Sequence, residues 1–152
     1  MCRRLAVALL AVAVALPASA GAADQTGTPG PDTLVGSAGP DRMAGRGGDD
    51  RIRGRAGNDQ LGGGRGNDLI SGDAGNDRIN GGPGDDTLLG GAGRDRIAGG
   101  AGADVIVGGT GNDRIFVRDG EVDRVSCGRG RDVVVADADD RVSADCEVVR
   151  RG

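Results

Sequence analysis

The sequence predicts an all-β solenoid built from short repeated strands, and three observations support this expectation. Between Gly27 and Phe116 the chain repeats every nine residues through ten units, without an insertion or deletion. Each unit carries one large aliphatic side chain between two positions of mixed polarity, the alternation of a half-buried strand. Glycine supplies 32 of the 152 residues and Phe116 is the only aromatic residue, so a conventional globular core is excluded.

Three further positions of the repeat are invariant across the ten units. The first and fourth are glycine, and the sixth is aspartate. Glycine adopts left-handed backbone conformations at no steric cost, so we expect positive φ angles at positions one and four, within a tight loop. We expect the aliphatic residues at position eight to point inward as two facing rows: Leu34, Met43, Ile52, Leu61, Ile70, Ile79, Leu88, Ile97, Ile106 and Ile115.

Individual units resemble a known repeat. Units 63–71 (Gly-Gly-Arg-Gly-Asn-Asp-Leu-Ile-Ser) and 108–116 (Gly-Gly-Thr-Gly-Asn-Asp-Arg-Ile-Phe) are similar to the G-G-x-G-x-D-x-U-x repeat of the RTX (repeats-in-toxin, haemolysin-type) calcium-binding family. This resemblance implies a right-handed parallel β-roll, a solenoid stapled by calcium. In such a roll six residues form a loop, three form a strand, and two units complete a turn. The ten units then predict about five turns.

Electrostatics gives an independent reason for calcium. Stacked turns bring equivalent aspartates to within about 4.8 Å of one another along each edge, where their charges repel. A hard dication that accepts carboxylate and carbonyl oxygens removes this repulsion, so we expect the chain to fold only with Ca²⁺. The resemblance assigns the carboxylate ligands to two edges, Asp32, Asp50, Asp68, Asp86 and Asp104 on one and Asp41, Asp59, Asp77, Asp95 and Asp113 on the other.

Four gaps between five loops on each edge predict about eight sites, each completed by backbone carbonyls of the glycine loops. Some units depart from the repeat. Pro31 and Pro40 replace the usual Asn or Asp at position five, as do Arg94 and Ala103 later in the chain. We therefore expect the weakest sites at the ends of the array and the tightest binding between Asp50 and Asp86.

Residues 117–152 predict a cap of degenerate repeats. The nine-residue period slips after Phe116, yet Asp123, Asp132 and Asp140 each still precede an aliphatic residue by two positions. An atypical end covers the open edge of a repeat array. Cys127 and Cys146 lie 19 residues apart, close to one 18-residue turn, which predicts a disulfide that closes the cap. A redox-active pair is disfavoured because the sequence contains no Cys-x-x-Cys spacing.

Residues 1–20 have the parts of a signal peptide: Arg3 and Arg4, an apolar run over 5–16, and the small residues Ala18-Ser19-Ala20. Cleavage as late as residue 23 also fits, and the export machinery stays open. The apolar run is too short for a membrane span. We expect a secreted, extracellular protein. Cleavage after residue 20 removes Cys2 and two of 19 arginines but none of 23 acidic residues, so the net charge becomes 17 − 23 = −6.

The composition argues against an enzyme. The chain has no histidine, so Ser-His-Asp and Cys-His arrangements are excluded and zinc is disfavoured. Two functions remain. One is an extracellular structural or binding module that folds on Ca²⁺. The other is an accessory or adhesion module derived from a secreted RTX enzyme or adhesin. We expect no nucleic-acid partner, and the oligomeric state stays open.

One outer face is rich in arginine. Position seven of the even-numbered units holds Arg42, Gln60, Arg78, Arg96 and Arg114. About eight bound Ca²⁺ ions would move the net charge from −6 to about +10, which favours an acidic polymer of an envelope or matrix as partner. Arginines opposite an acidic edge also serve simply to keep an array soluble, and this alternative stays open.

Overall fold

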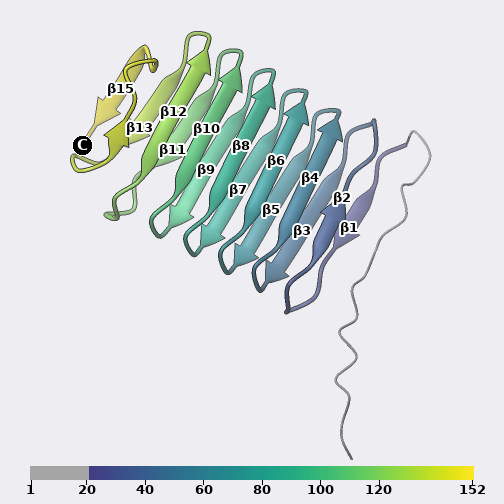
Figure 1. The fold of residues 1–152 in the computed structure, drawn as a ribbon. Helices are drawn as coiled ribbons and strands as arrows, with labels where there is room; N and C mark the ends of the chain where they lie inside the picture. The colour runs from purple at the N-terminus through teal and green to yellow at the C-terminus, as the bar shows by residue number, and fades with distance from the viewer. Residues whose placement is uncertain (1–20) are drawn as a thin grey trace, which may run out of the picture.

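Residues 21–152, the part of the chain that the computed structural model describes, wind into a parallel β-solenoid of about seven turns with two sheets (Figure 1). The predicted signal peptide lies outside this range. Within residues 21–152 no helix has the length and apolar character needed to cross a membrane. The predicted fold class, an all-β parallel roll, is confirmed.

Consecutive strands alternate between the two sheets. The first sheet has the order β1 (Asp24–Thr26), β3 (Arg42–Gly47), β5 (Gln60–Arg65), β7 (Arg78–Pro83), β9 (Arg96–Ala101), β11 (Arg114–Val117), β13 (Val133–Ala136) and β15 (Val148–Arg151). The second has β2 (Thr33–Val35), β4 (Arg51–Ala56), β6 (Leu69–Ala74), β8 (Thr87–Ala92), β10 (Val105–Thr110), β12 (Arg124–Arg129) and β14 (Arg141–Val142). All pairs are parallel. Within the repeats partners lie 18 residues apart, as in Arg51↔Leu69, so two units make one turn.

The strands are longer than the three residues that the repeat predicted. Strands β3 to β10 each contain six residues. The ladder continues through positions two and three of the following unit, where Arg55 pairs with Asp73 and Ala56 with Ala74. Half of the expected loop is therefore strand. The connection between β4 and β5 is only Gly57-Asn58-Asp59.

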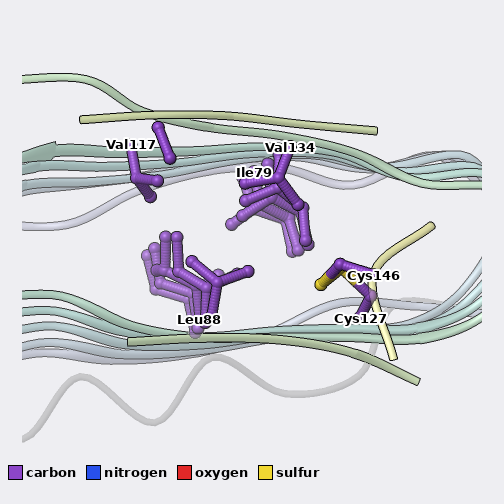
Figure 2. Close-up of a cluster of buried hydrophobic side chains, with 14 of the residues drawn as sticks. Ile79, Leu88, Val117, Cys127, Val134 and Cys146 are labelled. Carbon is purple, nitrogen blue, oxygen red and sulfur yellow. A yellow bond between two sulfur atoms is a disulfide. The ribbon is translucent and has the colours of Figure 1, made fainter. Parts of the chain in front are cut away.

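The core is the pair of aliphatic rows that the sequence predicted. All ten position-eight side chains are buried, and Figure 2 shows the rows facing each other, with Ile79 in one and Leu88 in the other. Their register partners continue each row from turn to turn, as in Ile79↔Ile97 and Ile70↔Leu88. Figure 2 also shows Val117 and Val134 of the cap beside these rows.

The prediction for the position-one glycines is wrong. Positive φ angles occur at positions two and four, as at Gly64 (116°) and Gly66 (125°), whereas Gly63 at position one has none. A Cβ atom on Gly63 would overlap the Oδ2 atom of Asp68. Position one is therefore glycine because the aspartate of its own unit occupies the space of a side chain.

The cap continues the solenoid, which raises the number of turns from the predicted five to about seven. Strands β12 and β13 pair with β10 and β11 at a spacing of 19 residues, because a single extra residue is accommodated between the starts of β11 and β12. The predicted disulfide between Cys127 and Cys146 is confirmed, with 5.2 Å between the Cα atoms. Asp145, beside Cys146, accepts hydrogen bonds from Gly128 N (2.9 Å) and Ser126 Oγ (3.0 Å).

Candidate metal centre

The ten predicted aspartates form two ladders, one on each edge of the solenoid. Each of them directly precedes a strand. Asp32, Asp50, Asp68, Asp86 and Asp104 precede strands of the second sheet, and Asp41, Asp59, Asp77, Asp95 and Asp113 precede strands of the first. All ten are buried, with exposed fractions between 1% and 8%. The predicted division into two edges is therefore what the fold produces.

In every ladder residue after Asp32, one carboxylate oxygen holds two turns together. The Oδ1 atom of Asp50 accepts a hydrogen bond from Asp32 N at 2.7 Å, and that of Asp68 accepts one from Asp50 N at 2.8 Å. The same bond recurs along both edges at 2.7 to 2.9 Å. Each of these carboxylates thus pairs with the backbone of the preceding turn.

The other carboxylate oxygen lacks a partner in most ladder residues. Within the described residues, no hydrogen bond reaches the buried Oδ2 atoms of Asp50, Asp59, Asp68, Asp77, Asp86, Asp95, Asp104 and Asp113. A buried polar atom without a partner is costly, and an ionised one more so. Eight such atoms in two regular rows indicate positions that a cation fits.

Burial also disturbs the ionisation of these groups. Loss of solvent, and to a smaller extent repulsion from neighbouring aspartates, raises the pKa of Asp77 and Asp86 from 3.8 to about 6. The pKa values of Asp95 and Asp104 also rise to about 6, mainly through burial. A nearby cation favours the charged form and opposes this shift.

A backbone carbonyl oxygen lies beside most of the orphaned carboxylate oxygens. Asp50 Oδ2 and the carbonyl oxygen of Gly63, in the next turn, flank the same point next to the Cα atom of Gly45. The arrangement recurs one turn later, where Asp68 Oδ2 and the Gly81 carbonyl flank Gly63. Among residues 21–152 no group of three or more His, Cys, Asp or Glu side chains converges. Carboxylate and carbonyl ligands suit a hard cation such as Ca²⁺.

Comparison with known families agrees with this donor set. A family model described as the RTX calcium-binding nonapeptide repeat matches four times, at residues 26–61, 63–88, 80–115 and 89–123, which together cover more than half of the chain. The chain belongs to this RTX family. The resemblance predicted from the sequence is confirmed. No curated protein matches the chain.

The first two RTX units differ from the rest. The Oδ2 atom of Asp32 accepts a hydrogen bond from Thr28 N at 2.5 Å, and that of Asp41 accepts one from Ser37 N at 2.6 Å. Their position-four glycines also lack the positive φ angle seen in later units. Asp32 and Asp41 lie in the ladders as predicted, but their carboxylates already have protein partners.

Two acidic residues of the cap, which were not among the predicted ligands, extend the ladders. Asp123 Oδ1 accepts a hydrogen bond from Asp104 N at 2.8 Å, and Asp132 Oδ1 accepts one from Asp113 N at 2.7 Å. Both residues are fully buried with unpartnered Oδ2 atoms, and burial raises the pKa of Asp123 to about 7. The signal was present in the sequence, because each precedes an aliphatic residue by two positions.

Proposed function

We propose that this RTX protein is an exported, non-enzymatic module that folds when Ca²⁺ binds between successive loops and then acts outside the cell as a structural or binding element. The rows of buried, unpartnered aspartate oxygens carry this proposal. Bound Ca²⁺ would supply the positive charge that these oxygens lack. Export is supported by the signal-peptide pattern and by the disulfide, which fits an oxidising compartment.

The residues that would hold Ca²⁺ are those with orphaned oxygens. They are Asp50, Asp68, Asp86, Asp104 and Asp123 on one edge, and Asp59, Asp77, Asp95, Asp113 and Asp132 on the other. Carbonyls of the position-one glycines would join them. Five residues on each edge again leave about eight gaps between successive loops. The set of proposed ligands is, however, shifted by one turn towards the C-terminus relative to the set predicted from the sequence.

The decisive experiment is a Ca²⁺ titration of the purified chain followed by far-ultraviolet circular dichroism and reversed with a chelator. We expect a coil spectrum without calcium and a β spectrum in millimolar calcium, because apolar burial in a chain so poor in large side chains is too small to order it alone. A chain that stays coil in millimolar calcium, or that is fully folded in chelator, would contradict the proposal.

A second candidate is adhesion through the arginine face. Arg78, Arg96 and Arg114 are exposed register partners on β7, β9 and β11, so three guanidinium groups recur at the strand spacing. Neither ion pair found within residues 21–152 involves them. An acidic polymer would neutralise this row. Adhesion to an acidic polymer depends on a positive net charge after calcium binding, which electrophoresis checks. The calcium-loaded protein should migrate towards the cathode relative to the calcium-free protein.

A further inference from the structure

A basic groove lies at one end of the arginine face, along the edge where β9, β11 and β13 begin. It has a volume of about 770 Å³ and is lined by Arg94, Arg96, Arg114 and Arg131 together with Asn76 and Asn112. Figure 1 shows these three strands side by side near the C-terminal end of the solenoid. Two of the four arginines belong to the row already described, and two come from the loops.

The repeat builds the groove from two neighbouring columns of side chains. One column is position seven, where Arg96 and Arg114 are register partners. The other is position five, where Asn76, Arg94, Asn112 and Arg131 follow one another in successive turns. Asn76 Oδ1 accepts a hydrogen bond from Arg94 N (2.8 Å), and Asn112 Oδ1 accepts one from Arg131 N (2.9 Å). The asparagines therefore fix the loops, while the arginine side chains project outward, all four exposed.

The charge of the groove is not balanced at its surface. Neither ion pair in the described part of the chain includes any of the four arginines. The carboxylates in the lining are Asp95 and Asp113, which are only 1% exposed and belong to the candidate calcium ladder. Like charges in register on adjacent strands destabilise each other. An anion that bridges the arginines would relieve this repulsion.

We propose that the groove binds the sulfate or carboxylate groups of an acidic polysaccharide, an inference that rests on the calcium-loaded roll proposed above. Guanidinium groups bind such anions through paired hydrogen bonds, and an asparagine amide can donate to a sugar hydroxyl. The columns repeat once per turn, which suits a linear polymer with regularly spaced charges. No aromatic side chain lines the groove, and this disfavours single-stranded nucleic acid, whose bases stack on aromatic rings.

The test is calorimetric titration of the full chain in millimolar Ca²⁺ and at fixed ionic strength, with dextran sulfate, polygalacturonate, uncharged dextran, inorganic sulfate and single-stranded DNA as probes. Two double variants remove the same charge. Arg94→Gln/Arg114→Gln alters the groove, whereas Arg51→Gln/Arg124→Gln alters exposed position-seven residues of the second sheet. Circular dichroism in calcium is recorded for every variant.

We expect one or both acidic polysaccharides to bind and uncharged dextran not to bind. The groove variant should lower that affinity about tenfold or more, and the control variant about twofold or less. Equal losses in both variants would overturn the inference, as would stronger groove-dependent binding of DNA. Binding of inorganic sulfate as tight as that of the polymer would overturn the polysaccharide assignment. A chain that folds in calcium but binds neither polysaccharide refutes the groove alone, whereas a chain that does not fold refutes the proposed function.

Discussion

At the scale of single residues, the second oxygen of each ladder carboxylate separates the proposed calcium ligands from aspartates with protein partners. Asp68 Oδ2 is buried without a partner, whereas Asp32 Oδ2 accepts a hydrogen bond from Thr28 N. Asp68→Asn keeps the Oδ1 bond to the preceding turn but removes the charge that calcium needs. We expect it to raise the calcium midpoint of folding about tenfold. Asp32→Asn, the matched control, should leave the midpoint nearly unchanged in the same dichroism titration, and equal shifts would contradict the assignment.

Position two carries backbone strain in some units. Arg55 has a φ angle of 80°, a left-handed conformation that costs a non-glycine residue about 1 to 2 kcal/mol. Arg55→Gly should therefore stabilise the calcium-loaded roll by about 0.5 to 1 kcal/mol in urea unfolding. Arg51→Gly removes the same charge from the same strand at a residue without positive φ, so it should destabilise by about 0.5 to 1 kcal/mol. Two changes of the same sign would show that charge, not backbone strain, dominates.

At the scale of elements, the disulfide ties one strand of the cap to the segment that leads into the last strand. Cys127 belongs to β12, and Cys146 lies just before β15. The double variant Cys127→Ser/Cys146→Ser should lower the stability of the cap by about 3 kcal/mol. Because each turn contacts only its neighbours, amide hydrogen exchange should speed up in β12 to β15 and stay unchanged in β4 to β7. Uniform acceleration along the chain would instead mean that the solenoid unfolds as one unit.

The sequence predicted the elements where one residue type has one physical role. The position-eight aliphatics, the two aspartate edges and the cysteine pair lie where the period places them. It failed where the same residue type has different physical roles at different positions. Gly63 and Gly64 are the same residue type, yet one avoids a carboxylate and the other supplies a positive φ angle. The residue type at position two does not identify the proposed calcium loops either. Arg55 and Ser37 are both non-glycine residues, yet only Arg55 has a positive φ angle.

At the scale of the whole molecule, the proposed calcium ligands are also the groups that protonate, so calcium and protons would compete for the same buried oxygens. Burial raises the folded pKa of Asp77, Asp86, Asp95 and Asp104 to about 6 and that of Asp123 to about 7, from an ordinary 3.8. A raised folded pKa means that the calcium-free roll is most stable below pH 3.8 and loses stability as the pH rises through about 6 to 7. Calcium binding has the opposite dependence, because the ligands must be ionised.

The calcium-free chain should therefore gain β structure as the pH falls from 8 to 4, since protonation removes the cost of burying charged carboxylates and, to a smaller extent, their mutual repulsion. In millimolar calcium the calcium midpoint should instead rise below about pH 6. Far-ultraviolet dichroism across this pH range checks both, with calcium removed by a chelating resin because soluble chelators lose affinity in acid. In the variant Asp123→Asn the side chain at this position cannot titrate. Without calcium, its gain of β structure with falling pH should therefore lack the part that occurs near pH 7. A chain that remains coil without calcium at every pH would show that the burial of these carboxylates depends on the metal itself.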